Sequence, residues 1–351
     1  MPSTNLHPLT SAGGKPVTWA LIGASTIAST YMIDALRRAP GGRIAGVLSS
    51  NPERGSRYAE RHRIPNAYSS LAELCADSAV EAVYISTAND SHASQALAAI
   101  AAGKHVLCEK PLATTIEDAQ AMIAAAASAG VKLGVDHHLR SAPAHLATKE
   151  LIISGRIGQV LGARVFHGTE LPASLRTWRV GRPEAGAGAA LDLTVHGADL
   201  LCFLLAEEIE EVVAMSARQG VSAHADIEDA IAGAMRLKGG ALATFHDSFT
   251  MRWVRTRVEI YGRDGAITIE DAMLDDPVAT VFLSDESGAC EIPIDQSEGL
   301  YERTVRLFNA AVRGDGEPAA SGEDGLRSLM VAVAALASAR ERRAVRLQGL
   351  A

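Results

Sequence analysis

A short apolar run that ends in a small-residue turn constrains the fold of this chain most. Residues Val17–Ile22 are too few for a helix and are followed at once by Gly23. A helix-favouring, alanine-containing pattern covers Ile27 to Arg38. A buried strand that enters a helix through a glycine turn is typical of a dinucleotide-binding unit, because the turn lets the backbone approach a pyrophosphate at the helix N-terminus.

Strands and helices alternate up to about residue 136. The predicted strands are 43–48, 82–87, 105–107 and 131–135, and the predicted helices are 53–63, 91–102 and 114–129. Strands separated by helices of about ten residues or more pair in parallel through right-handed crossovers. The sequence therefore predicts an α/β fold that begins with a doubly wound, Rossmann-type parallel sheet.

The second half of the chain has a different order of predicted helices and strands. Helices are predicted at 144–154, 189–205, 301–312 and 325–342, and strands at 159–167, 211–218, 230–237, 241–249, 255–261 and 266–270. Several of these strands are joined by short glycine-containing turns, which favour antiparallel pairing. We expect a C-terminal α+β domain with a predominantly antiparallel open sheet, one face of which another subunit could cover. The expected boundaries are a disordered tail at 1–16, a dinucleotide-binding Rossmann domain at 17–138 and a substrate-binding α+β domain at 139–351.

Charge and composition argue against several function classes. The net charge of −8 disfavours a nucleic-acid surface, and no apolar run approaches the roughly 20 residues that span a bilayer. The first 16 residues lack the pattern of a signal peptide, so a cytoplasmic enzyme is expected. The four cysteines show no CxxC pair, which predicts ordinary buried thiols and no metal site.

The end of the second predicted strand bears on the choice of dinucleotide. An acidic residue usually holds the adenine ribose of NAD at this place. Here the strand is followed by Ser49 and Ser50, with Arg54 one helical turn later. Hydroxyls and a guanidinium suit a 2′-phosphate, so NADP(H) is favoured. The alternative is that Ser49 only caps a turn and Arg54 is a solvated helix residue.

Two motifs carry candidate chemistry. Lys110 follows the 105–107 strand within Cys-Glu-Lys-Pro, at the carboxyl end where α/β sheets bind ligands, although the same residues also suit an ordinary loop. Asp192 and His196 are spaced i, i+4 on a predicted helix, which places a carboxylate and an imidazole on one face. Histidine is the usual proton donor in carbonyl reduction, whereas a surface ion pair is the alternative. Weaker single candidates are Asn89, Asp90, Ser91, His92, His137, His138, Arg140, Trp178, Arg179, His246, Asp247 and Tyr301.

Taken together, these segments resemble the glucose-fructose oxidoreductase/inositol dehydrogenase family. The resemblance is carried by residues 23–28, 108–111, 137–140 and 191–196 and extends over nearly the whole chain from Val17. It implies NADPH-dependent reduction of a keto-sugar carbonyl, which gives 1,5-anhydro-D-mannitol when the substrate is 1,5-anhydro-D-fructose. It also implies that Lys110, Asp192 and His196 act on a small sugar.

The same resemblance assigns the cofactor site by matching positions. The implied residues are Gly23, Ala24, Ser25, Thr26 and Ile27 at the pyrophosphate, Ser49, Ser50 and Arg54 at the 2′-phosphate, and Thr87, Ala88, Asn89, His92, Glu109, Lys110, Trp178, Arg179 and Tyr301 towards the nicotinamide. Ser25, where most relatives have glycine, can offer a hydroxyl to the phosphate. Asp136 belongs to the same set, but the resemblance implies that the nearest relatives tend to carry an amide at this position. A carboxylate cannot donate the same hydrogen bond and brings a charge.

Two other functions remain open at the level of sequence. The same scaffold serves NAD(P)-dependent dehydrogenases of an inositol or an aldose. A non-catalytic sensor of NADP(H) is a further alternative, which the lysine, histidine and aspartate disfavour because a sensor needs no proton donor.

Overall fold

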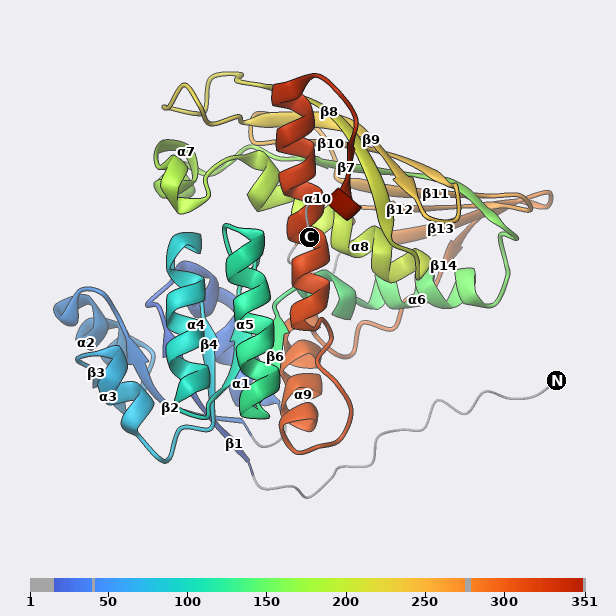
Figure 1. Cartoon of the computed structure of the whole chain (residues 1–351). Helices are drawn as coiled ribbons and strands as arrows, with labels where there is room; N and C mark the ends of the chain where they lie inside the picture. The colour runs from blue at the N-terminus through green and yellow to red at the C-terminus, as the bar shows by residue number, and fades with distance from the viewer. Residues whose placement is uncertain (1–15, 40–41, 275–278, 350–351) are drawn as a thin grey trace.

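The computed structural model consists of two sheet-based parts joined by long C-terminal helices (Figure 1). The structure describes residues 16–39, 42–274 and 279–349. The expected N-terminal tail therefore lies outside the described residues except for Pro16. The two sheets lie in separate parts of the molecule, with the first drawn in blue and cyan and the second in green to orange.

The first sheet is six-stranded and has the order β3-β2-β1-β4-β5-β6. Its strands, all paired in parallel, are β1 (Val17–Ile22), β2 (Gly42–Leu48), β3 (Asn66–Tyr68), β4 (Ala82–Ile85), β5 (His105–Cys108) and β6 (Leu133–Val135). The order reverses between β1 and β4, which is the switch point at which such sheets bind dinucleotides. The predicted doubly wound sheet is confirmed.

Helices cover both faces of this sheet. They are α1 (Ile33–Arg38), α2 (Pro52–Arg61), α3 (Leu71–Ala76), α4 (His92–Ala101) and α5 (Ile116–Ala129). The sequence analysis missed β3 and α3, because both are short and only Tyr68 and Leu74 within them are buried. Before α1 the chain forms a π-helical turn, η1 (Ala28–Met32), where a regular helix was expected.

The glycine turn after β1 has the backbone that its sequence predicts. Gly23 has φ +117°, and a Cβ at this position would lie 2.9 Å from the carbonyl oxygen of Ser86. A residue with a side chain would therefore strain the turn and collide with the neighbouring strand end. The hydroxyl of Ser25 accepts a hydrogen bond from the N–H of Ala28 at 3.1 Å and so caps the following helix.

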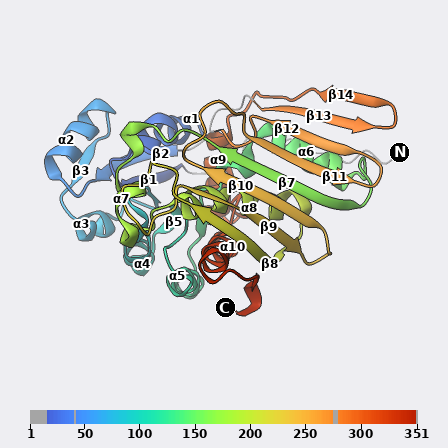
Figure 2. The same ribbon diagram turned by 90° about the horizontal axis from the view of Figure 1, so that it is seen from above.

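The second sheet is nine-stranded and has the order β14-β13-β12-β11-β7-β10-β9-β8-β15 (Figure 2). Its strands are β7 (Val160–Gly168), β8 (Ile209–Ala217), β9 (Ala230–Leu237), β10 (Leu242–Ser248), β11 (Arg257–Gly262), β12 (Ala266–Glu270), β13 (Thr280–Asp285), β14 (Gly288–Ile292) and β15 (Val345–Arg346). Only the central pair, β7 and β10, is parallel. The prediction of a predominantly antiparallel sheet is confirmed.

One face of this sheet is covered by helices and the other is open. The covering helices are α6 (Pro143–Ile153), η6 (Ala190–Thr194), α8 (Val195–Leu205) and α10 (Gly322–Glu341). The helix predicted at 189–205 thus begins as a π-helical turn. On the open side, Met215 is 81% exposed and Leu242 is 53% exposed.

The C-terminal helices fasten the two parts together. α9 (Leu300–Val312) packs against α1, and α10 contacts both α5 and strand β8 (Figure 1). Within the first core, Phe308 lies 5.2 Å from Trp19 between ring centroids, and Trp19 Nε1 donates to Asn309 at 3.0 Å. Segments distant in sequence therefore fix the orientation of the two sheets. The boundary expected at residue 138 stays a prediction.

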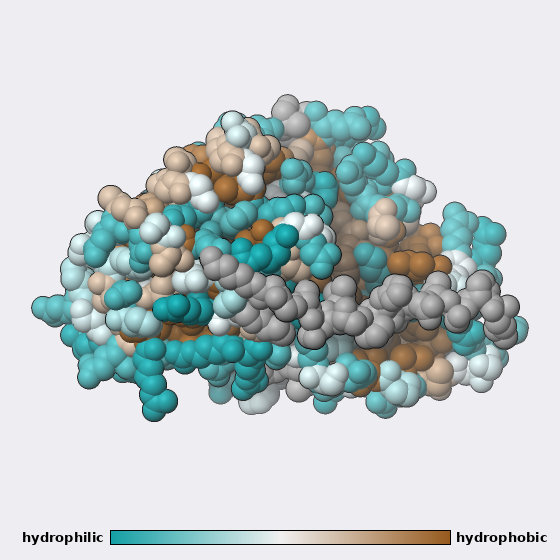
Figure 3. Space-filling view, turned by 90° about the horizontal axis from the view of Figure 1, so that it is seen from below, coloured by the Kyte–Doolittle hydropathy of each residue, from teal (hydrophilic) through white to brown (hydrophobic). Residues whose placement is uncertain are grey.

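The surface agrees with the charged, mixed composition. The face seen from below is mainly hydrophilic with smaller hydrophobic patches (Figure 3). One helical stretch, Pro183–Leu205, is long and apolar enough to cross a membrane, but 83% of its apolar window is buried, as in the core helix of a folded domain. All four cysteines are free thiols, and the prediction that they are buried is confirmed for Cys108 alone. Cys75 and Cys202 are half-buried, and Cys290 is exposed on the edge strand β14.

Candidate active site

The centre of the candidate site is a contact between the two parts of the chain. Lys110, directly after β5, extends its ammonium to η6, where it lies 2.6 Å from Asp192 Oδ1 and 2.8 Å from the Asp192 carbonyl oxygen. Both side chains are only 12% exposed. The structure thus brings together two of the three predicted catalytic residues, across 82 positions of sequence.

Arg179 holds the second oxygen of the same carboxylate. Its Nε lies 3.3 Å from Asp192 Oδ2, and its guanidinium stacks over the ring of Trp178 at 4.6 Å. Burial would raise the pKa of Asp192, but Lys110 and Arg179 outweigh it and lower the pKa to about 2. Asp192 is therefore a permanent anion between two cations.

His196 lies beside this ion cluster, on the first turn of α8. Its ring is surrounded by those of His137, His138 and His167, at centroid distances of 6.2, 5.4 and 6.0 Å. Burial, followed by the charge of Lys110, lowers the pKa of His196 well below its ordinary value. The ring is therefore neutral at neutral pH, and its Nδ1 has no hydrogen-bond partner among the described residues.

A column of aromatic rings links this histidine to the first helix of the dinucleotide unit. Tyr31 stacks on Tyr301 with ring centroids 4.9 Å apart, Tyr301 stacks on His138 at 4.8 Å, and His138 meets His196 edge-on. Tyr301, one of the predicted cofactor residues, is 5% exposed. It thus joins the two parts as well as bordering the site.

The residues expected at the adenosine end form a compact group after β2. Arg54 Nε donates to Ser49 Oγ at 3.0 Å, and Arg54 Nη2 donates to Ser50 Oγ at 3.3 Å. The side chain of Asn51 accepts from the backbone N–H of Arg54 and caps α2. Two hydroxyls therefore orient a guanidinium at the place where NAD-binding folds carry an acid.

The expected pyrophosphate turn is tied to its surroundings. Ser25 Oγ lies 2.8 Å from Ser86 Oγ, and the hydroxyl of Tyr58 donates to the Ser25 carbonyl oxygen at 3.0 Å. Ala24, Thr26 and Ile27 complete the turn and begin the helix. The Ser25 hydroxyl that the sequence offers to a phosphate is thus already engaged with Ala28 and Ser86.

The loop after β4 contains the next group of predicted residues. Thr87 donates to Gln95 at 2.7 Å. Asn89 Nδ2 donates at 3.2 Å to the carbonyl oxygen of Gly186, which follows the short helix α7 (Trp178–Gly181) that carries Arg179. His92 is fully buried, and its ring contacts the carbonyl oxygens of Pro111 and Thr87. His92 therefore links the loop that contains Lys110 to the loop that contains Ala88.

Two buried carboxyl groups lie under the same edge of the sheet. The hydroxyl of Tyr84 lies 2.5 Å from Glu109 Oε1 and 3.5 Å from Asp136 Oδ2. Asp136 is fully buried. Burial and then the charges of Glu109 and Asp136 raise the pKa of Tyr84 far above its ordinary value, so this hydroxyl keeps its proton.

A buried ion cluster behind the site was missed by the sequence analysis. Arg140 binds Asp199 through two hydrogen bonds of 2.8 and 2.7 Å, and its guanidinium also lies 3.0 Å from Asp324 on α10. His137 Nε2 lies 2.9 Å from Ser328 Oγ on the same helix. Arg140 and His137 had been noted only as single candidates. Asp199 lies three residues after His196, and that proximity was the available signal.

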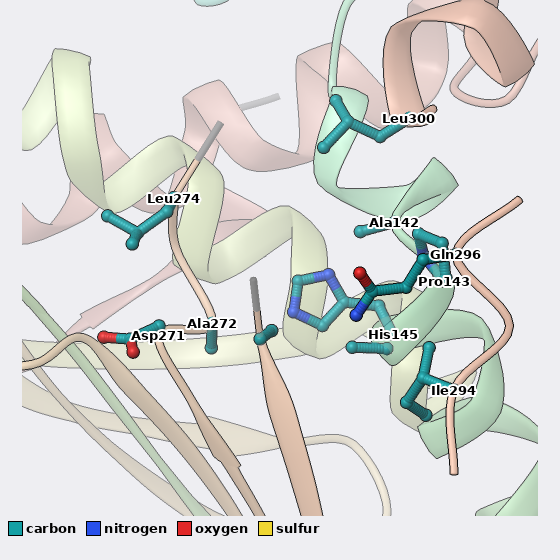
Figure 4. Close-up of a pocket in the computed structure, with 11 residues that line it drawn as sticks. Ala142, Pro143, His145, Asp271, Ala272, Leu274, Ile294, Gln296 and Leu300 are labelled. Carbon is teal, nitrogen blue, oxygen red and sulfur yellow. The ribbon is translucent and has the colours of Figure 1, made fainter. Parts of the chain in front are cut away.

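Other cavities and clusters lie apart from this centre. A small pocket lined by His145, Asp271, Leu274 and Gln296 lies beside α6 and contains none of the predicted site residues (Figure 4). Within the described ranges, no group of three histidine, cysteine or acidic side chains could hold a metal ion.

Comparison with known families matches both parts of the chain. The model described as "Oxidoreductase family, NAD-binding Rossmann fold" matches residues 17–137, and that of the "GFO/IDH/MocA C-terminal domain" matches residues 145–268. The matched segments include the glycine turn, Lys110, Asp192 and His196.

Curated relatives and solved structures extend this similarity over most of the chain. A 1,5-anhydro-D-fructose reductase from Ensifer adhaerens is 45% identical over 94% of this chain and 98% of its own. A myo-inositol 2-dehydrogenase from Thermotoga maritima is 29% identical over 82% of this chain and 86% of its own. The crystal structure of an aldose-aldose oxidoreductase from Caulobacter crescentus, complexed with glycerol, covers 95% of this chain and 100% of its own, with a TM-score of 0.88 and 25% identity.

Proposed function

The chain belongs to the GFO/IDH/MocA oxidoreductase family, and we propose that it uses NADPH to reduce the carbonyl group of a keto-sugar. The relatives support a sugar oxidoreductase with a dinucleotide-binding Rossmann domain. The proposed substrate is 1,5-anhydro-D-fructose, with 1,5-anhydro-D-mannitol as the product. The similarity to the Ensifer enzyme supports this choice over other keto-sugars.

The observation that carries the proposal is the ammonium of Lys110 held by Asp192 beside the neutral ring of His196. Carbonyl reduction needs a group that stabilises negative charge on the oxygen and a group that supplies a proton. Lys110 can do both, because it carries the positive charge and Asp192 fixes its position. His196 supplies a neutral imidazole, whose buried Nδ1 has no hydrogen-bond partner among the residues that the structure describes.

The chain's own residues fit NADPH at the far end of the proposed cofactor site. Arg54, oriented by Ser49 and Ser50, offers a guanidinium to a 2′-phosphate through charge-assisted hydrogen bonds. Gly23 gives the turn its φ of +117°, and in this fold such a turn brings the backbone close to a pyrophosphate. The expected contacts of Thr87, Ala88, Asn89, Glu109, Trp178 and Tyr301 with the nicotinamide end belong to the same proposal.

In the proposed mechanism the residues bind, orient and protonate the sugar. The nicotinamide, when bound, supplies the hydride. Lys110 hydrogen-bonds the carbonyl oxygen and gives it a proton as negative charge develops there. His196, being neutral, orients the same oxygen or an adjacent hydroxyl, and Asp192 holds Lys110 in place. Arg179 and Trp178 cover the opposite side of the carboxylate.

The test is a panel of keto-sugars and osones assayed for NADPH oxidation and then again with NADH. We expect turnover of 1,5-anhydro-D-fructose with NADPH preferred, and a loss of at least about a hundredfold in kcat for Lys110→Ala and for His196→Ala. A flat response across the panel would contradict the reductase function. Near-normal rates in both variants would contradict the mechanism alone.

A second candidate is an NAD(P)-dependent dehydrogenase of an inositol, which the Thermotoga relative favours. The neutral imidazole of His196 would then accept the proton of a cyclitol hydroxyl, and the ammonium of Lys110 would stabilise the hydroxyl oxygen. Faster oxidation of myo-inositol with NAD⁺ than reduction of any keto-sugar with NADPH would select this candidate.

The open sheet face supports a further part of the proposal, that the enzyme forms a homo-oligomer. Met215, Leu242 and Tyr261 expose 81%, 53% and 42% of their surface on or beside this face. Large exposed apolar side chains that gather on one sheet favour a contact with a second copy. Light scattering of the wild type and of Met215→Lys tests this assembly, and an unchanged monomeric mass in the wild type would contradict it.

A further inference from the structure

Asp247 is a buried carboxyl group that the proposed mechanism does not use. It lies near the end of β10 and is 1% exposed. Its Oδ1 has no hydrogen-bond partner within the described part of the chain. Burial raises the pKa of Asp247 to about 7, with the hydrogen bond from Thr194 acting in the opposite direction. Burying a carboxyl group with one unpaired oxygen costs free energy of folding, and such a group in a folded protein indicates a specific role.

The hydrogen bond of Asp247 goes to the segment that carries the catalytic candidates. Thr194 Oγ1 donates to Asp247 Oδ2 at 2.6 Å, and Thr194 itself is 1% exposed. Thr194 is the last residue of the π-helical turn η6, midway between Asp192 and His196. One hydrogen bond therefore ties the turn that presents both side chains to the sheet beneath it.

The strand neighbours of Asp247 include a histidine that lies close to His196. In the parallel pairing of β10 with β7, Asp247 lies opposite His167, whose ring is 6.0 Å from that of His196. On the other side, its partner on β9 is the apolar Ile231. The titratable residue opposite it on the sheet is His167 on β7, and Asp192 and His196 lie two residues before and after its partner Thr194. Asp229, before β9, is occupied by backbone N–H groups of residues 219, 221 and 222.

We propose that Asp247 is a positioning residue for the reduction: through Thr194 it fixes the π-helical turn so that Lys110 meets Asp192 and His196 in one geometry. The inference rests on the proposed function. A π-helical turn replaces the i→i+4 backbone hydrogen bonds of the α-helix with i→i+5 bonds and is rare, so we expect a tertiary anchor to have a large effect on it. A displacement of about 1 Å at a catalytic side chain lowers turnover by about a hundredfold.

The experiment compares variants that remove or retain the anchor. Thr194→Val removes the donor with little change in volume, Thr194→Ser retains it, and Asp247→Asn retains a neutral acceptor of the same shape. We expect Thr194→Val to lower kcat by about tenfold to a hundredfold while the Kd of NADPH stays within about twofold. We expect Thr194→Ser and Asp247→Asn to keep kcat within about threefold near pH 6.

A matched control separates positioning from loss of stability. Ser338 on α10 is buried, and its hydroxyl accepts from the N–H of Ala214 on β8 and donates to the carbonyl oxygen of Arg343, away from the site. Ser338→Ala should lower the Tm as Thr194→Val does and leave kcat unchanged. Equal kcat values for Thr194→Val and Ser338→Ala, or no rescue by Thr194→Ser, would overturn the proposal.

A second readout works without turnover. In the protein without added nucleotide, the ring proton resonances of His196 should shift in Thr194→Val and stay in place in Ser338→Ala. If the wild type reduces none of the carbonyl compounds, the proposed function fails, and unchanged His196 resonances in Thr194→Val would overturn the positioning role separately.

Discussion

Lys110 and Asp192 come from different parts of the chain and meet with 2.6 Å between the ammonium and Oδ1. Because Arg179 holds Oδ2 of the same carboxylate, Asp192 is a bridge between two cations that would otherwise repel each other. The position of Lys110 therefore depends on an anion supplied by the second sheet domain. The docking of the two domains is thus a condition for the candidate chemistry.

Asp192→Asn should change both activity and acid stability. We expect kcat to fall by about a hundredfold, because the amide leaves Lys110 and Arg179 without a counter-charge. The folded pKa of about 2 lies below the ordinary 3.8, so the stabilisation is present above pH 3.8 and is lost as pH falls through about 2. The ionised Asp192 side chain thus contributes about 2 kcal/mol to the free energy of unfolding. Urea unfolding at several pH values should show that the variant lacks this contribution. The exposed Glu341→Gln is the control, and identical pH profiles for both variants would contradict the prediction.

Arg54→Ala should lower the preference for NADPH over NADH. We expect the Kd of NADPH to rise by about tenfold to a hundredfold and that of NADH to change little, since charge-assisted bonds to a phosphate contribute about 1.5–3 kcal/mol. Arg57, on the same helix, pairs only with the exposed Glu53 at 3.7 Å, so Arg57→Ala is a matched control. Equal losses for both nucleotides in Arg54→Ala would mean that Arg54 does not contact the 2′-phosphate.

Arg140→Met should destabilise the protein without removing any proposed catalytic group. The variant leaves Asp199 and Asp324 as buried or half-buried carboxylates without their shared partner, which costs about 3–5 kcal/mol. Arg156 pairs with Asp285 near the surface, and Arg156→Met should cost less than about 1 kcal/mol. Urea unfolding measures the loss of unfolding free energy in each variant. Similar losses in Arg140→Met and Arg156→Met would contradict the prediction.

The sequence predicts the first sheet well because its signals are local. The strand at Val17–Ile22, the glycine at position 23 and the alternation of strands and helices each depend on neighbouring residues. The α+β second domain follows from short turns in the same way. By contrast, the parallel pairing of β7 with β10 joins segments about 80 residues apart, and no local pattern encodes that register.

The candidate site was predictable in its residues but not in its arrangement. The i, i+4 spacing of Asp192 and His196 predicts one helical face, whereas the structure places Asp192 in a π-helical turn whose shape is set by tertiary contacts. The approach of Lys110 to Asp192 depends on the docking of two domains. Thr194, which reads as an ordinary helix residue in the sequence, gains its role only from its contact with Asp247.

The stability of the wild type should also fall between mildly acidic and neutral pH because of Asp247. Its folded pKa of about 7 lies above the ordinary 3.8, so the folded state binds the proton more tightly than the unfolded chain. The resulting stabilisation is complete below pH 3.8 and is lost as pH rises through about 7, and it amounts to about 4 kcal/mol. Asp247→Asn removes this dependence, because an amide does not titrate. We therefore expect the variant to gain stability relative to the wild type between pH 5 and pH 8, as measured by urea unfolding, whereas a constant difference over that range would show that Asp247 is ionised throughout.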